Sequence, residues 1–364
     1  MIYLDYAATA PMSEAALQTY MDTARHFVGN SQSVHDSGTT SSGLLAQCRE
    51  VMAGCLNGHP TGVIFTSGGT EANMLAVDTF LATRSGREII TSEIEHASMY
   101  NYLKALEAKG YRLKTLPVSR NGHICLDSLR NTISTDTALV TIQYVNSEIG
   151  VLQDIKSIGA ICKEFGVPFH SDMVQAFGKI PIDVEALGVD SLSISSHKFY
   201  GPKGMGVCYI SPTLKRVAPL KGTTHEMGFR PGTVNLPAVA AMATAALERI
   251  PVMEVEYERI ASLRSRFLEI VDIKVLGEGL PHILGLSLGK VEGQLAMLEL
   301  SRRGIMVATG SACHAGLEAP SRTLLAIGES EMEAKTFIRV SFGEGTTLEE
   351  VELVGDMLRG ILER

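Results

Sequence analysis

The sequence contains one lysine in a setting that suits covalent chemistry. Lys198 follows a run in which serines alternate with leucine and isoleucine, a pattern that predicts a β-strand ending near Ser195. His197 is adjacent, and Gly201 and Pro202 must end the run. An amine held at the end of a rigid element, beside a hydroxyl and an imidazole, can form a Schiff base with a carbonyl compound. An exposed loop lysine is the alternative interpretation.

A Ser-Gly-Gly-Thr run at residues 67–70 lies between a short β-prone segment and a predicted helix. Gly69 and its neighbour permit close backbone approach, Thr70 offers a hydroxyl, and the helix start presents free N–H groups. The run therefore favours an oxyanion, which Ser195 and His197 could also reach from the same sheet edge. It is neither a Walker loop nor a GxGxxG motif, so ATP and NAD are disfavoured. A plain tight turn is the alternative.

Asp172 is the only carboxylate in a third polar cluster, three residues before Gln175. A buried carboxylate requires a cationic or hydrogen-bonding partner. Together with the anion site, Lys198 and Asp172 indicate pyridoxal phosphate: the lysine would bind the cofactor and the aspartate would keep its ring nitrogen protonated. His96, in a turn ahead of a predicted helix, could stack on the ring or carry protons. The alternatives are a helix cap for Asp172 and a core or capping histidine at position 96.

Cys313 lies in a loop of small polar residues, unlike the apolar settings expected for Cys125, Cys162 and Cys208. A thiol in such a loop is a candidate nucleophile when it is ionised, and an incidental surface cysteine is the alternative. The six cysteines form no CxxC pair and no zinc-ligand spacing. Most are therefore expected to be small core residues of a reduced protein, and no metal site is predicted.

Strands alternate with helices through the first two-thirds of the chain, which predicts an α/β fold with a mostly parallel sheet and helices on both faces. Ligands of such sheets bind beyond the carboxyl ends of the strands, so the polar clusters should meet along one edge. Before the first strand we expect a helix capped by Ser13, then a loop over 29–43, and then a second helix over 44–56. The predicted strands are 63–66, 88–91, 111–118, 138–142, 167–170, 191–195 and 206–210.

The pattern changes after residue 249, which predicts two domains in the 364 residues. We expect a large cofactor-binding domain over 13–249 and a smaller α+β domain formed by 1–12 with 250–364. The formal charge of −8, without a basic block, disfavours nucleic acid and anionic membranes as partners. The apolar run 236–247 is about half of the ~20 residues that a membrane span needs. With no secretory signal pattern, a cytoplasmic location is predicted.

Nine motifs extend over essentially the whole chain. They are, in order, LDYAATAP, FTSGGTEAN, EHAS, VNSEIG, HSDMVQAFGK, SSHKFYGPKGMG, GFRPGTVN, GSACHAG and IRVSFG. Their order resembles that of the cysteine desulfurases of the NifS/IscS type, which are pyridoxal-phosphate enzymes of aminotransferase class V with the type I fold.

The resemblance implies a role for each cluster. Lys198 matches the lysine that binds the cofactor covalently, Asp172 the partner of the ring nitrogen, Gln175 the contact to the ring hydroxyl and His96 the histidine stacked on the ring. The residues that match phosphate ligands are Gly69, Thr70, Ser195 and His197.

Four further positions follow from the same resemblance. Thr233 matches the threonine that reaches the phosphate of the neighbouring subunit, which implies a homodimer. Arg339 matches the arginine that binds the substrate carboxylate, and Cys313 the cysteine that carries the persulfide. Ser147 departs from the family, which commonly has Asn at this contact to the cofactor or substrate.

The function implied is conversion of L-cysteine to L-alanine, with the sulfur transferred to Cys313 as a persulfide. An acceptor protein, such as an iron–sulfur scaffold, would then take the sulfur for iron–sulfur cluster or thio-cofactor biosynthesis. A selenocysteine lyase or another class V enzyme is the nearest alternative. A sulfur-carrier or scaffold protein that has kept the fold without catalysis is another, but the presence of Lys198 and Asp172 argues against it.

Overall fold

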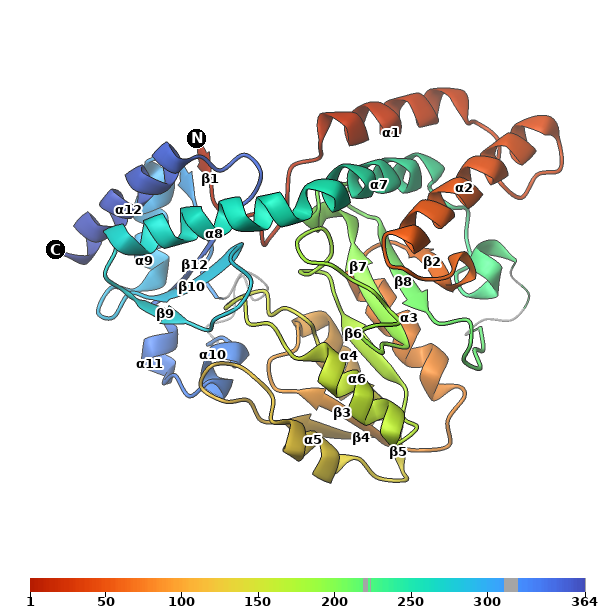
Figure 1. The fold of residues 1–364 in the computed structure, drawn as a ribbon, viewed down its shortest axis with the longest axis horizontal. Coiled ribbons are helices and arrows are strands. Elements are labelled where there is room, and N and C mark those ends of the chain that lie inside the picture. Colours follow the sequence, from red (N-terminus) through yellow and green to blue (C-terminus); the bar gives the residue numbers. More distant parts are fainter. Residues whose placement is uncertain (219–221, 223, 311–319, 364) are drawn as a thin grey trace.

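A seven-stranded sheet forms the centre of the computed structural model, which describes residues 1–218, 222, 224–310 and 320–363 (Figure 1). Its strand order is β2-β8-β7-β6-β5-β3-β4. Only β8 runs against its neighbours, so the predicted mostly parallel α/β fold is confirmed. The strands are β2 (Val63–Thr66), β3 (Glu88–Ser92), β4 (Arg112–Leu116), β5 (Thr137–Thr141), β6 (Phe169–Asp172), β7 (Ser191–Ser195) and β8 (Gly206–Ile210).

Most strands of this sheet supply side chains to two separate cores, because successive residues of a strand point to opposite faces. Phe65 and Ile90 pack in one core, and their neighbours Ile64 and Ile89 pack in the other. The first core includes residues of α1 (Glu14–His26), α2 (Asp36–Gly54), α5 (Leu126–Thr132), α6 (Ile155–Glu164) and α7 (Leu236–Arg249). The second includes residues of α3 (Gly69–Leu81) and α4 (Ala97–Glu107).

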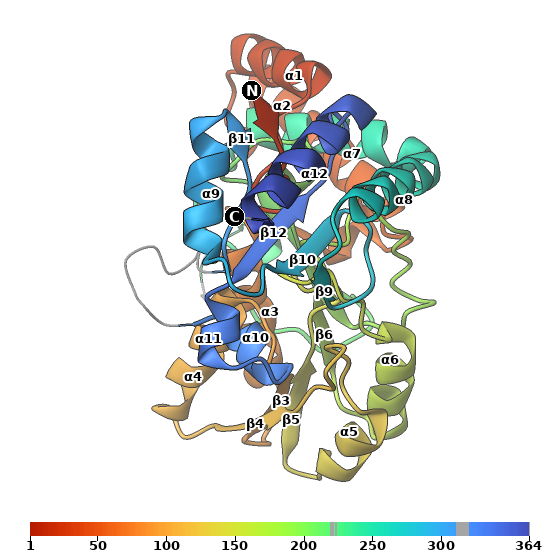
Figure 2. The same cartoon turned by 90° about the vertical axis from the view of Figure 1, so that its left-hand side faces the viewer.

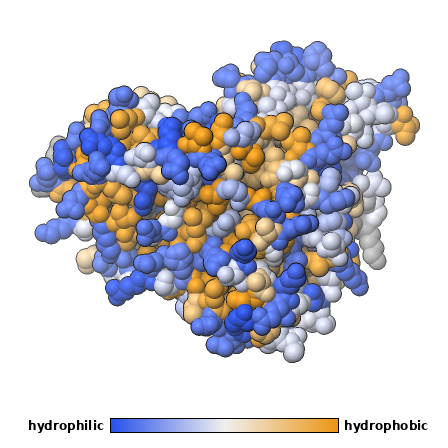
Figure 3. Space-filling model, in the orientation of Figure 1, coloured by the Kyte–Doolittle hydropathy of each residue, from blue (hydrophilic) through white to orange (hydrophobic). Residues whose placement is uncertain are grey.

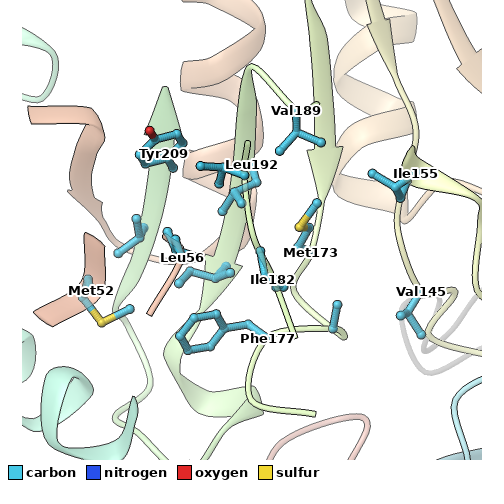
Figure 4. Packing of buried hydrophobic residues seen from close by; sticks show 14 of the residues in the cluster. Met52, Leu56, Val145, Ile155, Met173, Phe177, Ile182, Val189, Leu192 and Tyr209 are labelled. Carbon is cyan, nitrogen blue, oxygen red and sulfur yellow. The ribbon is translucent and has the colours of Figure 1, made fainter. Parts of the chain in front are cut away.

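The first core continues beneath the turn that carries Lys198. Phe199 is buried and packs edge-on against Phe177, with 4.6 Å between the ring centroids. Figure 4 shows Phe177 in the same hydrophobic cluster as Leu192 of β7 and Met52 of α2. An aromatic pair of this kind contributes about 1 kcal/mol beyond its buried area, so the residue after the lysine is firmly anchored.

A smaller, antiparallel sheet of three strands carries the rest of the chain (Figure 2). Leu4, near the N-terminus, packs in its core with side chains from residues 260–361. The elements here are β1 (Ile2–Tyr3), α8 (Met253–Ile270), β9 (Lys274–Leu276), β10 (Ile283–Ser287), α9 (Gly293–Arg302), β11 (Ile305–Met306), α10 (Arg322–Ala326), α11 (Glu331–Ala334), β12 (Phe337–Ser341) and α12 (Leu348–Leu362). The exact domain limits, 13–249 against 1–12 with 250–364, stay a prediction.

Helices α7 and α8 follow each other almost end to end, with a short 3-10 turn between them (Figure 1). By length and composition the stretch Leu236–Ile270 could cross a membrane, although 56% of its most apolar window is buried within the protein. Hydrophobic residues gather over the α7–α8 junction in Figure 3, where Leu247, Val252 and Val255 are exposed.

The predicted loop over 29–43 is wrong in its second half, because α2 begins at Asp36. His35 caps this helix through its Nδ1, which accepts a hydrogen bond from the backbone N–H of Gly38 at 3.2 Å. A Cβ at position 38 would lie 2.2 Å from the carbonyl oxygen of Ser33, so this turn needs glycine. A glycine that contributed to the loop prediction is thus required by close packing at a helix start.

The cysteine predictions are correct in two of three cases. Cys162 and Cys208 are buried, and burial raises the pKa of each thiol to about 12. Cys125 is exposed at the start of α5 instead of lying in an apolar setting. Hydrogen bonds from the Ser128 side chain and backbone lower the pKa of its thiol.

A buried ion pair holds the segment that precedes Thr233. The Glu226 carboxylate accepts hydrogen bonds from both terminal nitrogens of Arg49, at 2.9 and 2.7 Å, and from the backbone N–H of Phe65 at 2.7 Å. Glu226 and Met227 both adopt left-handed φ angles, 46° and 55°. Two such residues in sequence are costly and persist only where surrounding contacts enforce them, which is the role of this carboxylate.

We expect Glu226→Ala to lower the free energy of unfolding by about 3–5 kcal/mol, because it leaves the Arg49 charge without its partner. Urea denaturation followed by circular dichroism measures the change. Glu254→Ala, on the exposed side of α8, is the control and should change the free energy by less than about 0.5 kcal/mol. Equal effects of the two substitutions would contradict the assignment.

Candidate active site

One cavity of about 320 Å³ lies at the carboxyl ends of the parallel strands. Strand β7 ends at Ser195, and a 3-10 turn then brings Lys198 to the cavity wall. Ten of the twelve residues predicted from the sequence line this cavity, as the strand-end rule requires. They are Gly69, Thr70, His96, Ser147, Asp172, Gln175, Ser195, His197, Lys198 and Arg339.

The N-terminal segment holds the amine of Lys198. Its Nζ donates hydrogen bonds to the carbonyl oxygens of Ala7, at 2.6 Å, and Ala8, at 2.8 Å. A second lysine lies behind it: Lys179 donates from Nζ to the carbonyl oxygens of Gln175 and Lys198, at 3.2 and 3.4 Å. Burial, with a smaller effect of Lys198, lowers the pKa of Lys179 to about 7. Sequence reasoning missed Lys179, although it ends one of the nine motifs.

Asp172 is the last residue of β6 and is almost fully buried. Its Oδ2 accepts a hydrogen bond from Asn73 at 2.8 Å, and its Oδ1 accepts one from the backbone N–H of Val174 at 3.0 Å. Gln175 donates from Nε2 to the carbonyl oxygen of Ala7 at 2.9 Å, while its buried Oε1 has no partner among the described residues. A buried acceptor without a partner, in a cavity lining, suits a ligand that carries a hydroxyl.

His96 is both a helix cap and a cavity residue. Its Nδ1 caps α4 by accepting a hydrogen bond from the backbone N–H of Ser98 at 3.2 Å, and it also lies 2.8 Å from the Ser98 hydroxyl. Burial lowers the pKa of His96, and the charges of Lys198 and Arg322 lower it further, against the opposing effect of Asp172. The neutral imidazole is therefore favoured, and because Nδ1 is an acceptor, its proton lies on Nε2.

The start of α3 forms an open cradle for an anion. Gly68 precedes the helix with φ of 150° and provides no side-chain cap, so the N–H groups of the first turn are not used by a capping side chain. A Cβ at Gly69 would lie 2.7 Å from Val174, so a side chain would displace the cradle wall. Thr70 and Ser195 line the same hollow. Free N–H groups at a helix start, with two hydroxyls, suit a phosphate.

His197 lines this cradle in its neutral form. Its Nδ1 lies 3.1 Å from the Thr9 hydroxyl. Burial lowers the pKa of His197 to about 4, with further lowering by Lys198, Lys203 and Lys179. The imidazole can therefore donate one N–H to a bound anion, while the neighbouring lysines supply the positive charge.

Arg339 lies on β12, in the smaller sheet, and reaches across to the cavity. It donates from Nη1 to the carbonyl oxygen of Ser147 at 2.9 Å and from Nη2 to Asp5 at 2.7 Å. Its Nε is buried and has no partner among the described residues. Sequence reasoning missed Asp5, whose carboxylate occupies one edge of the guanidinium. The remaining N–H groups suit a substrate carboxylate.

Two predicted residues do not line this cavity. Thr233 is exposed and is not part of the cavity of its own chain. Cys313 lies outside the described residues, with the rest of 311–319. The flanking residues Gly310 and Pro320 line a second cavity of about 280 Å³, which shares His96 and Arg339 with the first. Across the described part of the chain, no group of three or more His, Cys, Asp or Glu side chains could hold a metal ion.

The fold and the cavity define an enzyme of the aminotransferase class V family, whose model matches residues 2–354. Within this family the chain belongs with the NifS and IscS proteins. It is 43% identical over 366 residues to a NifS protein of Bacillus subtilis, covering 97% of this chain and 92% of that protein. It is 36% identical to the cysteine desulfurase IscS of Dictyoglomus turgidum, covering 100% of this chain and 95% of that protein.

Solved structures agree with this assignment. A NifS-like protein superposes with a TM-score of 0.93 at 30% sequence identity, covering 100% of this chain and 99% of that one. SspA, solved in complex with cysteine, superposes with a TM-score of 0.81 at 29% identity, covering 94% of this chain and 99% of that one.

A buried carboxyl group lies directly before His96. Glu95 is fully buried: its Oε1 accepts hydrogen bonds from Ser92 at 2.7 Å and from the backbone N–H of Gln143 at 2.9 Å, and its Oε2 has no partner among the described residues. Burial raises the pKa of Glu95 from 4.5 to about 8, and the charge of Asp172 adds to this effect. The folded protein therefore binds a proton here that the unfolded chain has lost at neutral pH.

Because the folded-state pKa of Glu95 is the higher one, this group makes the protein less stable as pH rises from about 4.5 to about 8. Glu95→Gln removes the titration. We expect the urea midpoint of the variant, relative to the wild type, to rise between pH 6 and pH 8.5. Glu254→Gln, which changes an exposed carboxylate, should follow the wild-type profile. A constant difference between Glu95→Gln and the wild type across this range would refute the buried, protonated state.

Proposed function

We propose that this chain is a pyridoxal-phosphate-dependent cysteine desulfurase that converts L-cysteine to L-alanine and passes the sulfur to Cys313 as a persulfide. The observation that supports this most directly is the single cavity that joins Lys198, Asp172, an anion cradle and Arg339. A lysine, a carboxylate and an anion site suit the cofactor, and the arginine suits the carboxylate of an amino acid.

The residues of the cavity fit pyridoxal phosphate at four points. The amine of Lys198 would bind its aldehyde carbon, Asp172 would pair with its ring nitrogen, and the orphan Oε1 of Gln175 would accept from its ring hydroxyl. Its phosphate would occupy the cradle, whose residues are Gly69, Thr70, Ser195 and His197. When bound, this cofactor withdraws electron density from the amino acid attached to it. Ser147, at the cavity wall, is proposed to touch the cofactor or substrate.

The chain's own residues would orient the substrate and move its protons. Arg339 would bind the cysteine carboxylate through the N–H groups that Asp5 and Ser147 leave available. Lys198 would carry protons at Nζ once its amine leaves the carbonyl oxygens of the N-terminal segment. His96, stacked over the ring, would present its Nε2 proton to the reacting atoms.

Sulfur transfer requires a nucleophile, which we assign to Cys313. Its thiolate would attack the sulfur of the bound cysteine, forming an S–S bond as the C–S bond breaks. The electron pair stays on the substrate carbon, which takes up a proton and leaves as alanine. No external oxidant or reductant is needed, because the substrate carbon gains the electrons that the sulfur loses.

The finer assignments complete the proposal. The protein would be a cytoplasmic homodimer in which each subunit supplies Thr233 to the phosphate of the other, consistent with an exposed Thr233 in an open segment. The persulfide would pass to an acceptor protein, such as an iron–sulfur scaffold. Selenocysteine lyase activity is the alternative, and the selectivity between cysteine and selenocysteine distinguishes the two.

Two substitutions test the reaction. Cys313→Ala should keep the visible absorbance of the bound cofactor and lose sulfur transfer by at least a hundredfold, because only the nucleophile is removed. Lys198→Ala should lose the covalent attachment: after borohydride reduction of the linkage, the wild type should keep the cofactor through gel filtration under denaturing conditions, and the variant should not. Mass spectrometry of the Cys313 peptide, after cysteine is added to the wild type, should show one added sulfur atom. Full sulfur transfer by Cys313→Ala would disprove the mechanism.

Subunit crossing makes a separate prediction. Thr233→Ala alone should weaken cofactor binding about tenfold, the effect of one lost charge-assisted hydrogen bond. In a mixed dimer of Thr233→Ala with Lys198→Ala, one of the two sites combines an intact Lys198 with an intact Thr233. That site should regain wild-type affinity, measured by cofactor fluorescence. If mixing restores nothing, Thr233 does not act across the interface.

A further inference from the structure

A buried asparagine lies behind the carboxylate of Asp172. Asn73, on α3, is 1% exposed, and its Nδ2 donates to Asp172 at 2.8 Å. Its Oδ1 accepts two further hydrogen bonds, one from the Ser193 hydroxyl and one from Nε2 of His170 at 3.1 Å. On the far side of that imidazole, Nδ1 lies 3.1 Å from the hydroxyl of Ser191. These five side chains form one buried chain of hydrogen bonds.

Each hydrogen bond of this network has a fixed donor and a fixed acceptor. Burial lowers the pKa of His170 to about 3, so the imidazole is neutral and has one donor and one acceptor nitrogen. With Nδ1 accepting from Ser191, Nε2 donates to Asn73. The opposite orientation of the Asn73 amide would place its oxygen against the Asp172 carboxylate and its NH₂ group against the N–H of His170. Only the observed orientation satisfies every member.

The same amide also approaches the other face of the cavity. Its Nδ2 lies 3.4 Å from the hydroxyl of Ser98, which in turn lies 2.8 Å from Nδ1 of His96. Asn73 thus contacts the carboxylate expected at the ring nitrogen and the hydroxyl that holds the histidine expected above the ring.

We propose that Asn73 is a positioning residue that holds the Asp172 carboxylate directed at the cofactor's ring nitrogen, an inference that rests on the proposed function. Asn73 donates to Oδ2 of Asp172, and the backbone N–H of Val174 donates to Oδ1. Without Asn73, this buried carboxylate would lose a donor that fixes its orientation. Its interaction with the ring nitrogen of a bound cofactor would then be weaker, and that nitrogen would be less readily protonated.

The test uses the enzyme loaded with pyridoxal phosphate labelled with ¹⁵N in the ring. Asn73→Leu preserves the approximate shape but removes both donor and acceptor. We expect the ¹⁵N signal to move toward that of an unprotonated ring nitrogen, and the affinity for the cofactor to fall about tenfold. Thr79→Val is the matched control, because it removes a buried hydrogen bond of the same helix, to Leu75 at 2.7 Å, away from the cavity. It should lower stability without moving the ¹⁵N signal.

Variants of His170 test whether the network acts through Asn73 and remain informative if Asn73→Leu does not fold. His170→Leu removes the donor to Oδ1, so the ¹⁵N signal should move in the same direction by a smaller amount. His170→Gln can still donate to Oδ1 and should restore the signal. In the double variant, loss of His170 should add nothing to loss of Asn73, because it acts only through that amide.

The outcomes separate the two proposals. A wild-type protein that does not take up pyridoxal phosphate would overturn the proposed function. A wild type that binds the cofactor, with a wild-type ¹⁵N signal in Asn73→Leu or, if that variant does not fold, in His170→Leu, would overturn only the role of Asn73. An equal displacement in Thr79→Val would also overturn it, because the effect would then reflect loosened packing of α3.

Discussion

The buried carboxylate of Asp172 is the constraint on which the rest of the site depends. It is almost fully buried at the end of a central strand, and a charge in that position is tolerated only with donors aimed at it. The sheet supplies one donor from the backbone after β6, and α3 supplies the other through Asn73. The N-terminus of the same helix forms the anion cradle. The contact between Asn73 and Asp172 therefore also positions the cradle.

The N-terminal segment connects the two halves of the cavity. The carbonyl oxygens of Ala7 and Ala8 hold Lys198 of the large sheet, while Asp5 holds Arg339 of the smaller one. The turn over residues 5–8 thus positions both the group proposed to bind the cofactor and the group proposed to bind the substrate. This explains why the segment packs in the smaller core, through Leu4, yet contributes to the wall of the cavity.

Burial leaves the site with fewer charges than its composition suggests. The pKa values of His96, His197 and Lys179 are all lowered mainly by burial, so the histidines are neutral donors and Lys179 is easily deprotonated. Neutral imidazoles have a defined donor and acceptor nitrogen, which a charged imidazolium lacks. The neutral histidines therefore give the hydrogen bonds around the cavity a defined direction. The guanidinium of Arg339 stays positively charged and can bind a carboxylate.

Much of the site could be predicted from the sequence, because its residues follow strands directly. In a parallel sheet the carboxyl ends of the strands meet at one edge, so Lys198 and Asp172 were placed together by chain order alone. The start of α2 was not predictable, since Gly38 serves a close approach to Ser33 that the sequence pattern does not reveal. Nor was the exposure of Cys125, which depends on where α5 lies on the surface.

The sequence by itself determined the residue types, their order and the sheet edge at which they meet, because the local sequence pattern shows where each strand ends and a loop begins. Only the tertiary structure decided the partners that tune them: Asn73 behind Asp172, Asp5 beside Arg339 and Lys179 behind Lys198. These contacts join residues about 20 to more than 300 positions apart, and nothing in a local pattern encodes which buried polar groups must satisfy one another. Lys198, first recognised by its neighbours in sequence, is held by Ala7 and Ala8, its neighbours in space.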